Sequence, residues 1–179
     1  METTKVTNKS KHSAIRDFLV QNSELDNQSL RNKLLNVNIR LFQANKKYSG
    51  IVILIIDYMK KLLATSFSDY SNLRGISGAN IGIPINIIGF VSTKGHVVIM
   101  INPFIKEHSD KKRTVSSNCG SLVLPKSIKV ERSYSVTVDY HNEDGRPCFR
   151  TFEGTDAFVI QHEVDHNNGI LITQRKKRK

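Results

Sequence analysis

Two histidines and a glutamate near the C-terminal end of the chain have the spacing of a metal-binding helix. Residues 161–166 read Gln-His-Glu-Val-Asp-His, so His162 and His166 stand four residues apart. On a helix this spacing places both imidazoles on one face, about one turn apart, where they can bind one divalent metal. Glu163 is close enough to take the proton of an attacking water molecule. We interpret the segment as a metal-dependent hydrolytic site rather than an exposed polar turn with two unrelated histidines.

The residues around this motif predict the helix that the chemistry requires. An apolar run at 157–160 precedes the motif and would bury one side of the helix, which we expect to span 154–168. Gly169 follows as a C-terminal stop. Farther back, apolar residues at helical spacing predict a second helix over about 49–65, with a strand over 51–56 as the alternative.

The chain between these two helices is predicted to form antiparallel strands. Apolar runs at 85–91 and 97–101 predict a β-hairpin, and apolar residues alternate over 133–140 before a returning strand at 147–152. The polar stretch 106–118 is expected to be a loop or a frayed edge. The order of helix, strands and helix predicts an α+β fold, with the strands arranged around the motif-bearing helix.

Length and charge indicate one domain with polar ends. The chain has 179 residues and a formal net charge of +11. We expect a polar, disordered tail at 1–13, a single domain over 14–172 and a basic tail at 173–179. A basic end is usually a solvated tail, although it can also anchor a protein on nucleic acid or an acidic surface. The remaining charges are dispersed, which argues against a dedicated nucleic-acid binder.

Composition also restricts the compartment. Two cysteines are too few for a disulfide framework and favour a reducing compartment or a metal or catalytic role. The longest apolar run, 51–56, is too short to span a bilayer, and the first fifteen residues lack the apolar centre of a signal peptide. We therefore expect no membrane partner and a location in the cytoplasm or an organelle matrix.

Three segments in order resemble those of the peptide deformylase family, and the resemblance covers roughly 34–172. Residues 161–166 match the family's Gln-His-Glu-x-Asp-His without substitution. Residues 75–84, Gly-Ile-Ser-Gly-Ala-Asn-Ile-Gly-Ile-Pro, resemble the family's glycine-rich segment, and 119–125 resemble its Glu-Gly-Cys-Leu-Ser-x-Pro segment. The resemblance implies removal of the N-formyl group from the initiator Met of nascent chains. It also implies Fe(II), or Zn(II), Ni(II) or Co(II) in its place, held by two His and one Cys.

The position of the third ligand has two readings. Aligned without a gap on Gly-x-Leu-x-x-Pro, Gly120 keeps its place and Ser121 replaces the family's ligand cysteine. A neutral hydroxyl is a poor ligand for Fe(II) or Zn(II), whereas a thiolate is a good one. The other register makes Cys119 the ligand and inserts two residues before Pro125. Spacing alone does not choose between them. The Gly-x-Leu-x-x-Pro pattern favours Ser121 as the structural equivalent, whereas the chemistry favours Cys119, which a local bulge would bring to the metal.

The resemblance also implies roles for other residues. Glu163 would pass the proton of water to the departing amine, and Asn80 with the backbone N–H of Leu122 would bind the carbonyl oxygen of the formyl group. Asn80 replaces a Gln of the family and is one methylene shorter; an equally good reading is a turn residue tolerant of left-handed backbone. The pocket for the Met side chain is assigned to Gly75, Ile76, Gly120, Phe158 and Val159. For Ile76, Phe158 and Val159, plain core packing is an equally good reading.

Two further expectations concern structure and partners. Asp165 is expected to be structural and to pair with Arg132. The substrate would be a formyl-Met peptide or nascent chain bound by a monomer, and the basic tail would dock on the ribosome. A deformylase-like protein with impaired catalysis, which only binds metal, peptide or ribosome, is the alternative, because the substitutions fall in two of the three segments.

Overall fold

The computed structural model describes residues 50–68, 74–83, 85–119 and 126–175, so the predicted tail at 1–13 and the segment at 120–125 lie outside the described residues. The described helices are α3 (Gly50–Ser68) and α4 (Gly154–Asn167), with two short 3-10 turns, η1 (Ala79–Ile81) and η2 (Ile172–Arg175). The described strands are β1 (Gly75–Ser77), β2 (Ile87–Val91), β3 (Val97–His108), β4 (Lys112–Ser117), β5 (Ile128–Ser133), β6 (Ser135–His141) and β7 (Pro147–Glu153).

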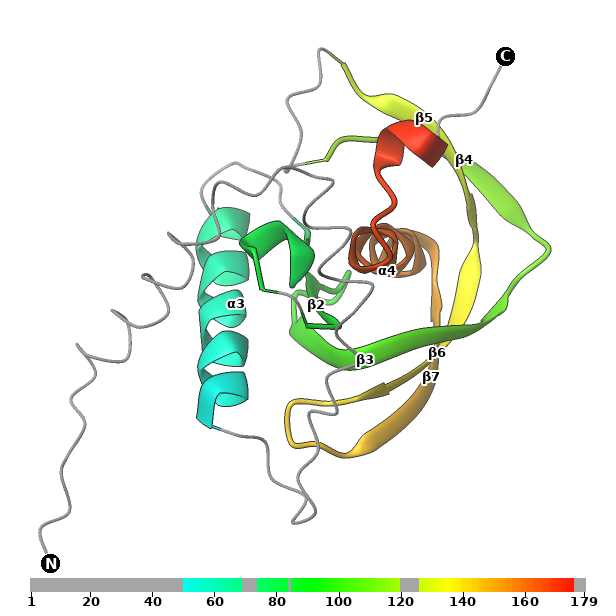
Figure 1. The fold of residues 1–179 in the computed structure, drawn as a ribbon. Helices are drawn as coiled ribbons and strands as arrows, with labels where there is room; N and C mark the ends of the chain where they lie inside the picture. The colour runs from blue at the N-terminus through cyan, green and yellow to red at the C-terminus, as the bar shows by residue number, and fades with distance from the viewer. Residues whose placement is uncertain (1–49, 69–73, 84, 120–125, 176–179) are drawn as a thin grey trace, which may run out of the picture.

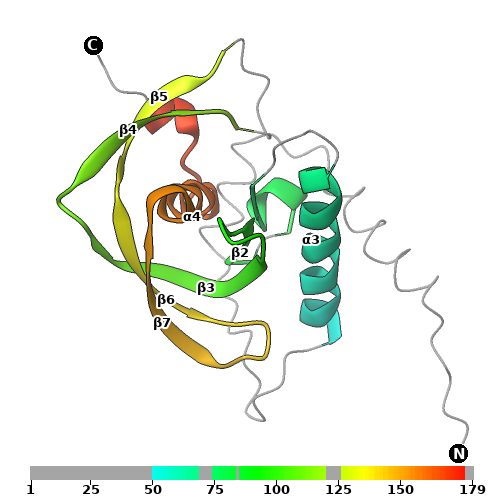
Figure 2. The ribbon, with the colours of Figure 1, turned by 180° about the vertical axis from the view of Figure 1, so that it is seen from behind.

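Antiparallel strands surround α4. Five of them form one sheet in the order β1-β2-β3-β6-β7, and β4 pairs with β5 in a second sheet. The long strand β3 has two register shifts against β6, which let it bend and continue toward the second sheet. Figure 1 looks nearly along α4 and shows β3, β6 and β7 below and beside it and the β4–β5 pair beyond; the reverse view in Figure 2 shows the same enclosure.

The two helices pack on different parts of the core. Buried side chains of α3, including Val52, Met59 and Leu63, pack against apolar residues of β2 and β3. A second cluster, which includes Phe90, Val138 and Ile160, fills the space between the sheet and α4. This burial fixes α4 inside the sheets, so its polar positions must be satisfied by protein partners or by a ligand.

The expected α+β fold is confirmed, and so are both helices and the hairpin, which the structure forms from β2 and β3. The prediction of a loop or frayed edge over 106–118 is wrong for most of its length. Here β3 continues to His108, and β4 pairs with β5 in six consecutive positions. Most side chains of β4 are exposed, so the sequence lacks the apolar alternation that marks a half-buried strand, and pairing with β5 specifies it instead.

The C-terminal boundary differs from the prediction as well. The predicted tail at 173–179 starts too early, because η2 includes residues 173–175 and Arg175 donates to Asp165 of α4 at 2.8 Å. Within the described ranges, neither long helix combines the length and apolar character needed to cross a bilayer.

Candidate metal centre

The helix α4 is held in register by contacts along its length. At its start, the Thr93 amide and hydroxyl donate to the Asp156 carboxylate in the first turn. In the middle, the Gln161 amide accepts from the Ser133 N–H and donates to the Ser133 carbonyl, so one side chain fixes the helix against the end of β5. Gly169 ends it with φ of 71°, which confirms the predicted stop.

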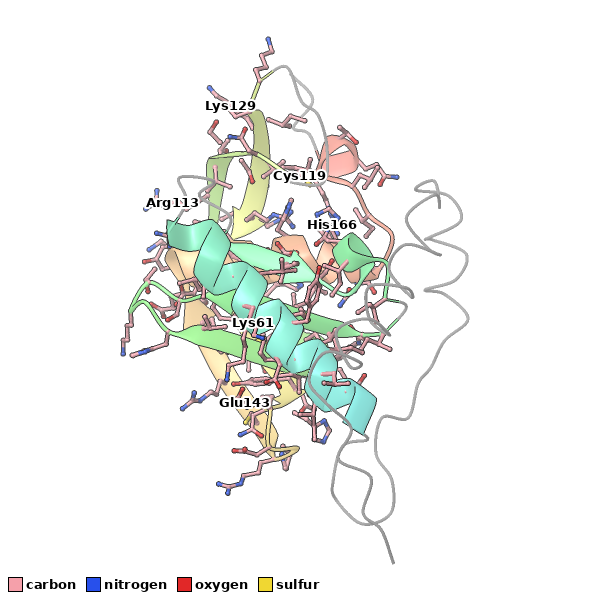
Figure 3. All side chains as sticks on the ribbon, turned by 90° about the vertical axis from the view of Figure 1, so that its left-hand side faces the viewer. Lys61, Arg113, Cys119, Lys129, Glu143 and His166 are labelled. Carbon is pink, nitrogen blue, oxygen red and sulfur yellow. The ribbon has the colours of Figure 1, made fainter. Side chains whose placement is uncertain are left out.

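Three metal-binding atoms converge beside this helix. The Nε2 atoms of His162 and His166 are 3.1 Å apart, and their rings are almost perpendicular, at 80°. The Cys119 Sγ lies 3.3 Å from His166 Nε2, and all three ligand atoms lie within 4.8 Å of one another. Figure 3 shows Cys119 next to His166, one from the chain after β4 and the other from α4. As the sequence predicts, the four-residue spacing places both imidazoles close enough to bind one metal ion.

The chemistry of these three groups fits a divalent metal. Burial lowers the pKa of His162 to about 3, with the neighbouring His166 and Arg132 charges acting in the same direction. Burial also lowers the pKa of His166. Both imidazoles are therefore neutral near pH 7, which is the form that binds metal. A thiolate and two neutral imidazoles form a common donor set for Zn(II) and related ions.

Glu163 is enclosed next to these ligands. Its side chain is almost fully buried, and burial raises its pKa to about 8 despite the opposing charge of Arg132. The Oε2 atom is buried and has no hydrogen-bond partner among the described residues. A carboxyl group with a pKa near neutrality can accept and release a proton readily, which suits an acid–base role. The unpaired oxygen is also the one that a water molecule or substrate can satisfy.

Gly75 makes room for this carboxyl. A Cβ at Gly75 would lie 2.4 Å from Glu163 Oε1 and 2.7 Å from Val159 Cγ1, closer than packing allows. The edge strand β1 thus passes directly over the carboxyl because residue 75 has no side chain.

Gly75→Ala is expected to displace Glu163 and lower kcat by about 10²-fold, because small misplacements of catalytic groups are costly. We would measure kcat together with bound metal. Gly95→Ala is the matched control, since nothing lies within 4 Å of its Cβ although its φ is positive. A Gly75→Ala enzyme with unchanged kcat would contradict the close approach.

A second polar group lies behind the ligands. The Asp165 carboxylate, itself buried, accepts from Arg132 Nη1 on one oxygen and from Arg175 Nη2 on the other. The predicted pairing of Asp165 with Arg132 is confirmed. Arg175 was not predicted as part of this network, since no local pattern relates a residue after the helix to a carboxylate inside it. The spacing of ten residues becomes a contact only because the chain turns back at Gly169.

The other predicted site residues have different outcomes. Gly75 and Ile76 of β1 are buried, while Phe158 and Val159 of α4 are partly buried. Asn80 lies in η1 and does not have a positive φ, so tolerance of left-handed backbone is not the reason for asparagine there. Gly120, Ser121 and Leu122 lie outside the described residues. Of the two candidates for the third ligand, Cys119 is therefore the one whose position is described.

Two histidines of a buried helix and a cysteine from the chain after β4, beside an enclosed carboxyl, are the site of a metal-dependent hydrolase. The chain belongs to the polypeptide deformylase family, whose model matches residues 24–179. It is 34% identical over 140 residues to the peptide deformylase of Aquifex aeolicus, an alignment that covers 74% of this chain and 81% of that one.

Solved structures agree with this assignment. The class I type b peptide deformylase of Acinetobacter baumannii has a TM-score of 0.66 and 31% identity, covering 80% of this chain and 93% of that chain. A structure of the same enzyme with Met-Ala-Ser bound has a TM-score of 0.65 and 29% identity, covering 80% of this chain and 92% of that chain. The chain is thus a metal-dependent hydrolase that removes N-formyl groups, and family membership favours this activity over an impaired binding protein.

Proposed function

We propose that the chain hydrolyses the formyl group of formyl-Met peptides, with Fe(II) or Zn(II) held by Cys119, His162 and His166. The observation that carries this proposal is the convergence of three ligand atoms beside the buried Glu163. Ni(II) or Co(II) would suit the same donors, because imidazole and thiolate bind each of these ions. When bound, such a metal supplies a Lewis acid that polarises the formyl carbonyl and lowers the pKa of water.

Glu163 carries the proton in this mechanism. It takes a proton from the attacking water as the new C–O bond forms, and it gives that proton to the amine nitrogen as the C–N bond breaks. Water and a formyl amide thereby become formate and a free amine, with no other reactant. Burial raises the pKa of Glu163 to about 8, which helps the carboxyl to hold the proton until the amine departs; the ionised form that accepts the proton from water gains population as the pH rises toward this pKa.

We assign Asn80 a role as donor to the developing oxyanion, and its contacts with Ser77 support this role. Its Oδ1 accepts from the Ser77 backbone N–H at 2.8 Å and from the Ser77 hydroxyl at 2.6 Å. Because a backbone N–H can only donate, these contacts identify the oxygen of the amide and direct its NH₂ group away from Ser77. We assign this NH₂ group, together with the backbone N–H of Leu122, to the carbonyl oxygen of the formyl group.

Asn80→Asp is expected to lower kcat by about 10²-fold, because one oxyanion donor is lost. The substitution keeps the acceptor oxygen for Ser77, so the turn around η1 should persist. Asn80→Gln is the matched control: it retains the donor on a longer side chain and should keep most of the activity. Steady-state rates of formate release, measured at equal metal content, would test this. Equal activity of the Asp and wild-type proteins would remove Asn80 from the mechanism.

The substrate side chain is assigned to the residues next to the carboxyl. The buried Ile76 and the partly buried Val159 lie on β1 and α4, the two elements that meet at Glu163. Phe158, which contacts Tyr134 edge-to-face with ring centroids 6.5 Å apart, provides a further apolar surface, and Gly75 and Gly120 would provide space. Such an apolar lining suits a Met-like side chain. The Met-Ala-Ser peptide bound to the Acinetobacter enzyme supports this class of ligand.

The protein loaded anaerobically with Fe(II), or with Zn(II), should release formate from formyl-Met-Ala-Ser. Acetyl-Met-Ala-Ser, which is one methyl group larger at the reacting carbonyl, should react much more slowly. Stoichiometric metal without formate release would support the impaired alternative and overturn the proposal.

We also assign to the chain a monomeric state, a cytoplasmic or organelle-matrix location, and ribosome docking through its basic end. Loss of ribosome co-sedimentation on deleting 176–179 would support the last of these.

A further inference from the structure

A second cleft lies on the side of α4 that is turned away from the metal centre. It has a volume of about 640 Å³ and lies between α4, the later part of β3, β5 and η2. Gln161, Val164 and Asp165 line it, whereas His162, Glu163 and His166 belong to the other side of the helix. In Figure 1 these lining elements lie on the side of α4 away from α3. The cleft is thus separate from the hydrolytic site.

A buried guanidinium group at the wall of this cleft has an unused donor. Arg132 is 6% exposed and lines the cleft, and only its Nη1 atom bonds to Asp165. Its Nη2 atom is buried and has no hydrogen-bond partner in the described part of the chain. A buried donor without a partner is destabilising, and more so when the group is charged. Such a group calls for an acceptor oxygen that the protein does not supply.

Positive charge in the cleft is concentrated at Arg132 and Arg175, although the lining as a whole is balanced by Asp165, Glu131 and Asp110. Asp165 is shared by Arg132 and Arg175, so these three groups together carry one positive charge. Lys112 lies 3.9 Å from Glu131, and this second pair is neutral. The remaining charged groups of the lining are Asp110, which is exposed, and the titratable His108.

We propose that this cleft binds a small oxyanion, a carboxylate or a phosphate, through the guanidinium groups of Arg132 and Arg175. Planar guanidinium groups present parallel N–H donors that match these oxygens in pairs. The ligand would add the missing acceptor for Arg132 Nη2 without displacing Asp165 from Nη1. The site is distinct from the hydrolytic groups, because none of its lining residues is a metal ligand or the proposed proton carrier.

Entry to the site requires a movement of Arg175. Because Arg132 Nη2 is covered, a ligand oxygen can reach it only when a neighbouring side chain shifts. Arg175 pairs with the Asp165 carboxylate, and its side chain is 47% exposed. It can therefore move without disturbing the packed core. The movement would bring two cations to one anion while Asp165 remains paired with Arg132.

The test is a titration of the full-length, Zn(II)-loaded protein with inorganic phosphate and, separately, with succinate at constant ionic strength. The Nε–Hε NMR signals of Arg132 and Arg175 report on the site directly. We expect a saturable shift with a dissociation constant of about 1 mM or below for at least one of the anions. A stronger response to phosphate or to succinate identifies which oxyanion the cleft prefers.

Two variants locate the binding. Arg175→Gln removes one cation of the proposed contact and should weaken binding at least about tenfold because a charge-assisted contact is lost. Lys129→Gln removes an equal charge from an exposed residue of β5 outside the cleft and should change the dissociation constant less than about twofold. No saturable shift, equal affinity in the Arg175→Gln protein, or a shift that disappears in metal-free protein would overturn the proposal.

Discussion

Replacing Glu163 with glutamine is expected to lower kcat by about 10³-fold while the bound metal remains. Glutamine has nearly the same shape but cannot accept and return the proton of water. The enclosure of Glu163, with Gly75 packed directly against its carboxyl, leaves little space for another base to replace it. Steady-state formate release and metal content measured on the same sample would separate a lost proton carrier from a lost metal.

The matched control is Glu153→Gln, which makes the same chemical change at an exposed residue next to the first turn of α4. Its side chain makes no capping hydrogen bond, so neither the helix nor kcat should change appreciably. If Glu163→Gln retained most of the wild-type kcat at full metal content, the proposed role of this carboxyl would be wrong.

Replacing Cys119 with alanine is expected to abolish stoichiometric metal binding and therefore to abolish turnover. The thiol lies 3.3 Å from His166 Nε2, and its removal would leave two imidazoles, which bind Fe(II) or Zn(II) far more weakly. We expect the metal affinity to fall by at least about 10²-fold, more than for the loss of a group behind the ligands. Metal analysis after dialysis against a weak chelator is the direct measurement.

Cys148→Ala provides the control for this substitution. Cys148 is the other free cysteine, lies on β7 and has the Arg146 carbonyl as its contact, so its loss should leave the metal in place. Ser121→Ala addresses the gap-free alignment, in which Ser121 takes the place of the ligand. Full metal content in Cys119→Ala together with metal loss in Ser121→Ala would reverse the assignment of the third ligand.

The two sides of α4 have different chemical roles. His162, Glu163 and His166 face the metal centre, whereas Asp165 of the same turns joins Arg132 and Arg175. Because Asp165 stands next to His166, its two guanidinium partners hold the turn that carries this ligand. The same two arginines line the cleft proposed to bind an oxyanion. The cleft therefore lies next to the residues that support His166 but includes none of the metal-binding residues.

The sequence predicts the elements that have a local pattern. Apolar residues at helical spacing mark α3, and the apolar runs around Lys94-Gly95 mark the hairpin of β2 and β3. The β4–β5 pair has no such pattern, because one strand is largely exposed and the other alternates only in part. Its stability depends on pairing between strands, which is a non-local property.

By itself, the sequence determines the reactive helix of this protein. The types and spacing of residues 162, 163 and 166 are sufficient, because helix geometry places the two histidines on one face. The tertiary structure decides what those residues meet. Spacing leaves both Cys119 and Ser121 possible, and folding brings the Cys119 sulfur to His166 across forty-seven residues. Folding also encloses Glu163 under Gly75 and joins Arg175 to Asp165, because burial and long-range contacts arise only when distant segments pack together.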